Sequence, residues 1–112
     1  MDTELGNPKV RGPQEAVAKG SMVTIKTMVK HPMESGLRKD KDTGQTIPAY
    51  FIQKVEATYL GQPVMKAEWT GAVSRNPFFS FNLKATATGP VVVTWTDNQG
   101  GTWNDKTELK VM

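Results

Sequence analysis

The sequence contains no cysteine and only one histidine, His31, and both scarcities narrow its chemistry. Without a thiolate, the chain has no sulfur nucleophile, no thiolate metal ligand, no redox pair and no means of carrying a substrate on its own sulfur. With a single imidazole, a zinc site would consist almost entirely of carboxylates, and a Ser-His-Asp arrangement would have one possible base. The composition therefore excludes cysteine chemistry by this chain, and we expect no metal and no cofactor.

Long apolar runs and blocks of like charge are also absent from the sequence. No apolar stretch approaches the roughly 20 residues of a membrane span. The 14 Lys and Arg residues outweigh the 11 Asp and Glu residues to give a net charge of +3, and the two signs are interleaved, as in residues 38–42. A run of five or more like charges is typical of an arm that binds nucleic acid or an anionic membrane, so we expect neither partner.

The first seven residues lack a basic start followed by an apolar stretch. We expect a flexible N-terminal tail at 1–7 and no export signal of the chain's own. The remaining length, 8–112, suits one domain. The chain's 10 glycines and 7 prolines separate short runs rich in Val, Thr, Ile, Phe and Trp, a pattern typical of an all-β sandwich or barrel.

Alternating apolar and polar residues predict the strands of this domain. Their expected positions are residues 9–11, 22–29, 49–60, 64–69, 78–83, 91–95 and a last strand that ends near Val111. Residues 14–19 are too few for a stable helix and are interpreted as a turn or one helical coil. About seven strands in about 100 residues indicate an immunoglobulin-like β-sandwich, here without a disulfide, and an OB-type barrel is the main alternative.

One connection is longer than a scaffold needs. Residues 31–48 separate the second and third expected strands, and a connection of this length in a compact domain is usually functional or disordered. We favour a functional loop. Met33, Leu37 and Ile47 are apolar residues of this loop that belong to no strand, so they must pack either under it or against another protein.

The same loop contains the triplet Asp-Thr-Gly at residues 42–44, which also occurs in retroviral-type aspartic proteases. In those enzymes an apolar-flanked loop lets two carboxylates share one proton. Here the flanking residues are Lys41 and Gln45, which favours a solvent-exposed turn instead. His31 is interpreted as a strand-end histidine hydrogen-bonded to backbone, because the sequence shows no partner for base chemistry.

Aromatic and methionine side chains suggest a binding surface. Such residues concentrate at protein interfaces, where Lys and Glu are depleted. Met28, Met33, Trp69 and Phe78 are therefore interface candidates if an exposed apolar patch exists. Basic residues near aromatics can also bind single-stranded nucleic acid by stacking, which leaves a nucleic-acid-binding OB-like barrel as the alternative function.

Four segments, taken together, resemble one protein family. They are residues 31–40 (HPMESGLRKD), 47–52 (IPAYFI), 76–81 (NPFFSF) and 94–98 (TWTDN), the last followed by Gly100. In these segments, and over about residues 8–111, the chain resembles SoxZ, the small-subunit family of the SoxYZ sulfur-carrier complex. The first segment is long and unusual in composition, which makes the resemblance specific.

The resemblance implies a periplasmic, immunoglobulin-like, non-catalytic subunit that forms a heterodimer with SoxY. SoxY carries the intermediates of thiosulfate oxidation on a C-terminal cysteine arm and presents them to Sox enzymes, which would contact the pair transiently. The resemblance also implies export together with SoxY, whose signal serves both chains. The lack of cysteine agrees with this expectation, because the reactive thiol must then lie on the partner.

The long loop, the aromatic candidates and the family motifs together predict a set of partner-binding residues. These are His31, Pro32, Met33, Leu37, Arg38, Lys39, Trp69, Asn76, Pro77 and Phe78. The basic residues of the loop would also steer an anionic cargo or docking partner, unless they form only a solvated face.

Overall fold

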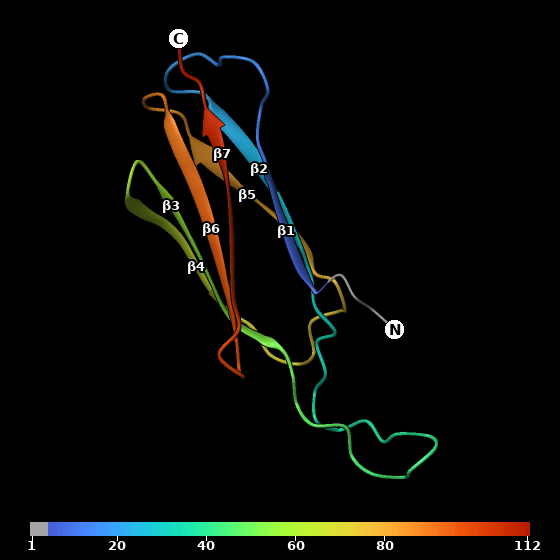
Figure 1. Ribbon diagram of the computed structural model, residues 1–112. Helices are drawn as coiled ribbons and strands as arrows, with labels where there is room; N and C mark the ends of the chain where they lie inside the picture. The colour runs from blue at the N-terminus through green and yellow to red at the C-terminus, as the bar shows by residue number, and fades with distance from the viewer. Residues whose placement is uncertain (1–4) are drawn as a thin grey trace.

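Seven β-strands and no helix make up the described part of the chain, residues 5–112 of this computed structural model (Figure 1). The strands are β1 (Gly6–Arg11), β2 (Met22–Lys30), β3 (Ile52–Tyr59), β4 (Gln62–Glu68), β5 (Phe78–Lys84), β6 (Gly89–Asp97) and β7 (Thr102–Leu109). Valine and isoleucine recur at their buried positions, because branched side chains pack well on a pleated surface. The predicted all-β class is confirmed.

The strands form two antiparallel sheets that enclose one core. One sheet has the order β1-β2-β5 and the other the order β4-β3-β6-β7. Strands β1 and β7 are in contact on one side of the sandwich, while β4 and β5 are the edge strands on the other. Two separate sheets confirm the predicted immunoglobulin-like β-sandwich. The OB-type barrel, in which one sheet curls round toward closure, is the wrong alternative.

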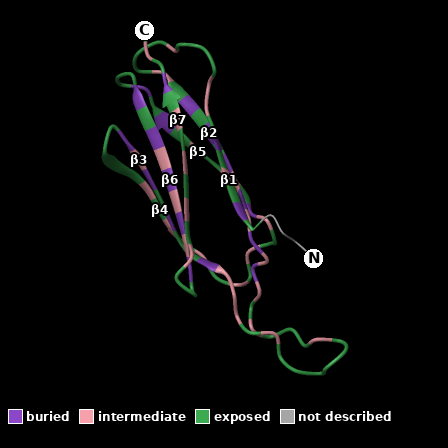
Figure 2. Ribbon diagram, viewed as in Figure 1, coloured by how far each residue is buried: buried purple, intermediate pink, exposed green. Residues whose placement is uncertain are grey.

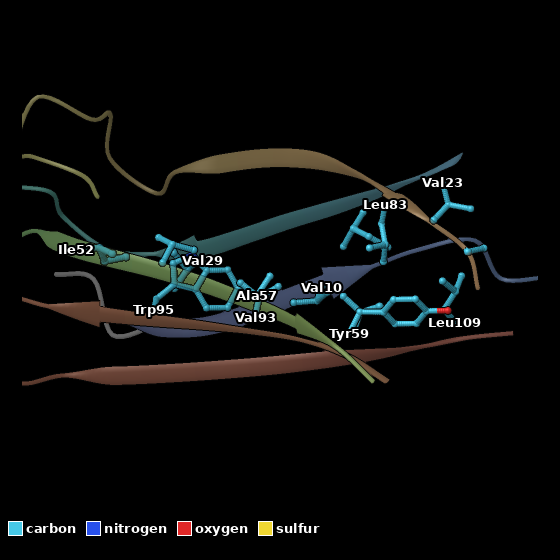
Figure 3. Close-up of a cluster of buried hydrophobic side chains, with 14 of the residues drawn as sticks. Val10, Val23, Val29, Ile52, Ala57, Tyr59, Leu83, Val93, Trp95 and Leu109 are labelled. Atoms are coloured by element: carbon cyan, nitrogen blue, oxygen red, sulfur yellow. The ribbon is translucent and has the colours of Figure 1, made fainter. Parts of the chain in front are cut away.

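Side chains from both sheets fill the space between them (Figure 3). Trp95 is the largest side chain that is completely buried. The other buried apolar side chains of the core include Val10, Val23, Ile25, Val29, Ile52, Val55, Ala57, Tyr59, Leu83, Val91, Val93 and Leu109. Full burial of one such side chain contributes about 1.5–3 kcal/mol. Packing therefore holds the two sheets together without a disulfide.

Tight turns set the register of the β3–β4 hairpin. Leu60 and Gly61 have φ angles of 55° and 77°, the positive values that a two-residue hairpin turn requires. Tyr59 pairs with Gln62, so Leu60 and Gly61 are the two residues of the turn. Residues 14–19 form bends and a turn without any helix, which agrees with their interpretation as a turn.

Four strands begin at residues other than those expected: β4 and β6 start two residues early, and β1 and β3 differ by three residues. Strand β1 starts at Gly6, three residues before the predicted start, so the end of the expected tail 1–7 belongs to a strand. Gly6 is buried, with a φ of 88°. Residues 1–4 lie outside the described range. Strand β3 begins at Ile52 instead of residue 49, which lengthens the connection before it.

The two ends of this elongated sandwich differ (Figure 1). The C-terminus and the β3–β4 turn lie at one end, and the long connection between β2 and β3 projects from the other. Within residues 5–112 there is no helix of the length and apolarity needed to cross a membrane. The projecting connection is the segment that sequence analysis singled out.

Candidate partner-binding arm

Residues 33–50 leave the sandwich as a narrow extension, which we call the arm (Figures 1 and 2). Two isolated antiparallel bridges, Glu34 with Tyr50 and Lys39 with Thr46, align its two halves. Because its sequence lacks the alternation of a half-buried strand, no continuous ladder forms between the bridges. Most arm residues are exposed or half-buried, in contrast to the strands (Figure 2).

The tip of the arm is a tight polar turn. Asp40 Oδ1 accepts hydrogen bonds from the backbone N–H groups of Asp42 at 2.8 Å and Thr43 at 3.3 Å. Gly44 follows with a φ of 73°, and its N–H donates to the Asp40 carbonyl at 2.8 Å. The Asp-Thr-Gly triplet is thus part of an exposed turn, as expected, and not of an enclosed carboxylate pair.

Beyond its base, the arm exposes both an apolar and a charged side chain to solvent. The Leu37 side chain is 88% exposed, more than any other large apolar residue among 5–112. Arg38 Nη2 donates to Glu34 Oε1 at 2.8 Å, and Arg38 Nε reaches both carboxylate oxygens at 3.2 Å. This hydrogen bonding lowers the pKa of Glu34. The ion pair orients the guanidinium, and because the Arg38 side chain is 59% exposed, solvent screens the pair and limits its contribution to stability.

Beneath the arm, the fully buried His31 links separate segments of the chain. Its Nε2 lies 3.2 Å from Asp97 Oδ2, and its Nδ1 accepts the Met33 N–H at 3.2 Å. Its own backbone N–H donates to Asn76 Oδ1 at 3.0 Å, and its carbonyl accepts the Asn76 N–H at 2.9 Å. The ring also lies 4.4 Å from the Tyr50 ring, measured between centroids. We call His31, Tyr50, Asn76 and Asp97 the polar hub.

The protonation of the hub follows from this geometry. Because Nδ1 of His31 accepts a backbone N–H, the ring proton lies on Nε2 and points at Asp97. Burial lowers the pKa of His31, against the raising effects of the hydrogen bond and charge of Asp97. Burial likewise raises the pKa of the Tyr50 phenol. The predicted backbone hydrogen bond of His31 is confirmed, and a neutral, fully bonded imidazole at the arm's base is a structural support.

Asp97 connects the hub to the β6–β7 turn. Its Oδ1 accepts the N–H of Gln99 at 2.9 Å and the N–H of Gly101 at 2.7 Å, while Oδ2 faces His31. Nothing in the sequence predicted this role, because His31 and Asp97 lie 66 residues apart and meet only through the sheet topology. The signal that could have found Asp97 is its place before a Gly-Gly turn, where Asp bonds local backbone.

The β4–β5 connection, residues 69–77, supports the arm from the side. A Cβ at Gly71 would lie 2.5 Å from Ser35 Cα, so only glycine permits this close approach. The Pro77 carbonyl accepts the Val29 N–H at 3.3 Å, and Pro77 is buried. Together with the Asn76 bonds to His31, these contacts hold the arm's base against the sandwich.

A partly exposed aromatic cluster lines the open side between β4 and β5. The Trp69 and Phe79 rings meet edge to face at 5.4 Å, and the Phe79 and Phe81 rings stack at 6.2 Å. Met65 and Ala67 of β4 complete the cluster, whose members are all half-buried. Of this cluster, only Trp69 was among the interface candidates predicted from the sequence. The two strands are sheet edges, which leaves their inward side chains uncovered on one side.

The predicted partner-binding residues divide by exposure. Leu37, Arg38, Lys39 and Phe78 are exposed, Pro32, Trp69 and Asn76 are half-buried, and His31, Met33 and Pro77 are buried. The structure brings all of them to the arm and its end of the sandwich, where Phe78, the first residue of β5, lies on that sheet's outer surface beside Met28. Met33 is anchored as its Sδ accepts the Ile52 N–H at 3.4 Å. The buried members position the arm.

No group of three or more His, Cys, Asp or Glu side chains within residues 5–112 could hold a metal ion. The described residues thus form an immunoglobulin-like sandwich with a projecting arm, whose base contacts a buried polar hub. No curated protein sequence matches the chain. The family model for "Sulphur oxidation protein SoxZ" matches residues 10–108. The chain belongs to the SoxZ family, and the resemblance noted in its sequence is confirmed.

Solved structures agree on the fold. A superoxide reductase (neelaredoxin) from Ignicoccus hospitalis aligns with a TM-score of 0.74 and 21% identity over 98% of this chain and 83% of its own. A putative superoxide reductase from Thermotoga maritima gives 0.70 and 19% over 94% and 85%. The sulfur carrier protein SoxY from Chlorobium limicola f thiosulfatophilum gives 0.63 and 16% over 99% and 81%. At these identities the similarity is one of fold.

Proposed function

We propose that this protein is the thiol-free, non-catalytic subunit of a sulfur-carrier complex and that its arm binds a SoxY-type chain. That partner supplies the C-terminal cysteine that carries the intermediates of thiosulfate oxidation. One observation carries the proposal: a member of a sulfur-oxidation family has no cysteine, so any covalently held sulfur must be on another chain. The fold shared with SoxY is compatible with a pair of related sandwiches.

The arm supports the proposed mode of binding. Leu37 is a large apolar side chain surrounded by solvent, and Ile47 on the returning half is only half-buried. The hub and Gly71 fix the base of the arm, so its surface is presented in one orientation before a partner arrives. Pre-organisation of this kind reduces the conformational entropy lost on binding. The adjoining cluster around Trp69 extends the apolar surface along the open side.

The test is co-expression of this chain with a SoxY-type protein, followed by co-purification and a calorimetric titration of the two purified chains. We expect a stable one-to-one complex. The Leu37→Asp variant should bind at least tenfold more weakly, because a carboxylate would be buried in an apolar contact. Met112→Asp is the matched control: Met112 is 77% exposed, and the C-terminus lies at the opposite end of the molecule.

The outcomes separate the function from the site. If the wild-type chain is a stable monomer that binds no cysteine-bearing SoxY-type protein, the proposed function is wrong. If the complex forms and Leu37→Asp binds as tightly as Met112→Asp, the function stands and the arm is not the interface. Transient contact with Sox enzymes and a periplasmic location reached on the partner's signal are further parts of the proposal. Fractionation of cells with and without the partner gene tests the location.

A further inference from the structure

The strands of the three-stranded sheet supply lysine and arginine side chains to its outer surface but no Asp or Glu. We call this surface the basic face: the outward side chains of β1, β2 and β5. Its charged members include Lys9, Arg11, Lys26 and Lys84, and the three strands contain no Asp or Glu. Lys9, Lys26 and Lys84 form no ion pair with any residue of 5–112. Arg11 comes within 3.8 Å of Asp105 on β7 and stays 65% exposed.

One cross-strand pair on the basic face places two positive charges opposite each other. Arg11 lies directly opposite Lys26 in the β1–β2 register, and both side chains point outward. Like charges directly opposite each other destabilise an antiparallel pair. The flexible Arg11 and Lys26 side chains can splay apart in water, but the repulsion persists at low salt.

The outer surface of the other sheet is built in the opposite way. Lys54 pairs with Glu68 and Glu56 with Lys66 across β3 and β4, and Lys54 Nζ lies 3.9 Å from Glu56 Oε1. Opposite charges therefore neutralise one another there. The outer surface of the four-stranded sheet thus places opposite charges side by side, whereas the strands of the basic face supply only positive charges.

An apolar groove lies among the cations of the basic face. It has a volume of about 180 Å³ and is lined by Lys9, Arg11, Lys26, Thr27, Met28 and Phe78. Phe78 is 65% exposed and sits opposite Met28 in the β2–β5 register. An aromatic ring and a methionine at the floor, with three cations around them, fit a ligand that has an apolar side chain flanked by carboxylates.

We propose that the basic face docks an acidic segment of a partner protein, with one apolar side chain of that segment seated against Met28 and Phe78. This surface is separate from the arm and does not depend on the proposed function. A protein segment fits better than nucleic acid because the face offers a single aromatic ring for stacking, and because its apolar floor is aliphatic in part. Carboxylates opposite Arg11 and Lys26 would remove the repulsion between them.

The probe is a synthetic peptide of glutamates around a central leucine, titrated into the ¹⁵N-labelled full chain. Amide signals should shift along β1 and β2 and at Phe78, while those of the arm stay in place. Affinity should fall as salt rises. The double variant Lys26→Glu/Lys84→Glu should bind at least tenfold more weakly. The matched control, Lys66→Glu/Lys106→Glu, makes the same charge change on the other sheet and should bind within twofold of wild type.

Four results would overturn the proposal. They are no binding of the peptide at low salt, equal loss of affinity in both double variants, shifts centred on the arm, and tighter binding of a single-stranded oligonucleotide than of the peptide at the same salt. Equal binding of a peptide whose leucine is replaced by serine would refute the seat at Met28 and Phe78. Thermal unfolding of each variant confirms that it is folded before binding is compared.

Discussion

The arm and the sandwich from which it projects differ in how far their apolar side chains are buried. In the sandwich, Trp95 and the other core side chains bury their apolar surface against one another. In the arm, Leu37 is almost entirely exposed and the two halves are aligned by isolated bridges. The arm therefore gains little stability from burial of its own side chains, and the hub holds its base in place. The comparison suggests that different residues determine the stability of the fold and the binding of a partner.

The boundary between the two regions is the polar hub. It lies between the arm and the apolar core, and the contacts of His31 with Asn76 and with Asp97 join segments distant in sequence. Core changes should therefore affect stability alone, hub changes should affect both stability and the arm, and arm changes should affect binding alone. The following predictions test this gradient.

The largest loss of stability is expected for Trp95→Ala. The side chain is completely buried in the core, and truncation of a buried aromatic typically costs about 3–5 kcal/mol. The loss is measured by urea unfolding of the isolated chain. Trp95→Phe should lose less, because it keeps most of the volume and removes an indole N–H that has no hydrogen-bond partner within residues 5–112. Equal losses in the two variants would contradict this account of the core.

An intermediate loss, about 1–3 kcal/mol, is expected for Asp97→Asn. The new amide group would face either the His31 Nε2–H or the N–H groups of Gln99 and Gly101, so at least one buried donor would lose its acceptor. Moving the ring proton to Nδ1 does not help, because Nδ1 faces the Met33 N–H.

Urea unfolding measures the Asp97→Asn loss, and amide signals of residues 33–50 show whether the arm moves with it. The control is Asp42→Asn at the arm tip, where the side chain is exposed and the change should stay within about 0.5 kcal/mol. A loss at residue 97 no larger than that at residue 42 would show that the hub is not a structural joint.

The strands were predictable from the sequence, while the hub was not. Alternation at positions such as Val23, Ile25 and Val29 is a local pattern, and it identified β2 almost to its ends. The His31–Asp97 pair depends instead on which strands become neighbours, a property of topology that no local pattern encodes. The length of the arm was predictable. Its internal bridges and the burial of Met33 were not predictable, since they depend on how the base of the arm packs against the sandwich.

Lowering the pH should have a smaller effect on the free energy of unfolding. In the unfolded chain His31 takes up a proton near pH 6.5, whereas its pKa is lowered in the fold by burial. The unfolded state therefore binds more protons in that range, so the free energy of unfolding falls as pH drops below about 6.5, by at most about 1.4 kcal/mol per pH unit. Groups that face the ring, Asp97 and Tyr50, do not reverse this sign, since the net pKa shift already includes Asp97.

The pH effect is measured by urea unfolding at several pH values between 5.5 and 7.5, a range above the ordinary pKa of carboxylates. His31→Gln removes the chain's one imidazole and should be less stable at neutral pH but flat across this range. Wild-type stability that is equally flat would mean that the buried ring takes up its proton within the fold, and hence that the hub tolerates a charge.

The smallest effect on stability is expected where the effect on binding is largest, at Leu37→Asp. Because the side chain is 88% exposed and contributes nothing to the core, its replacement should change the free energy of unfolding of the isolated chain by less than about 0.5 kcal/mol. The same change should weaken the complex with a SoxY-type chain at least tenfold. A large stability loss in the isolated chain would mean that the arm folds back onto the sandwich in solution. The proposed division between a sandwich that determines stability and an arm that determines binding would then be wrong.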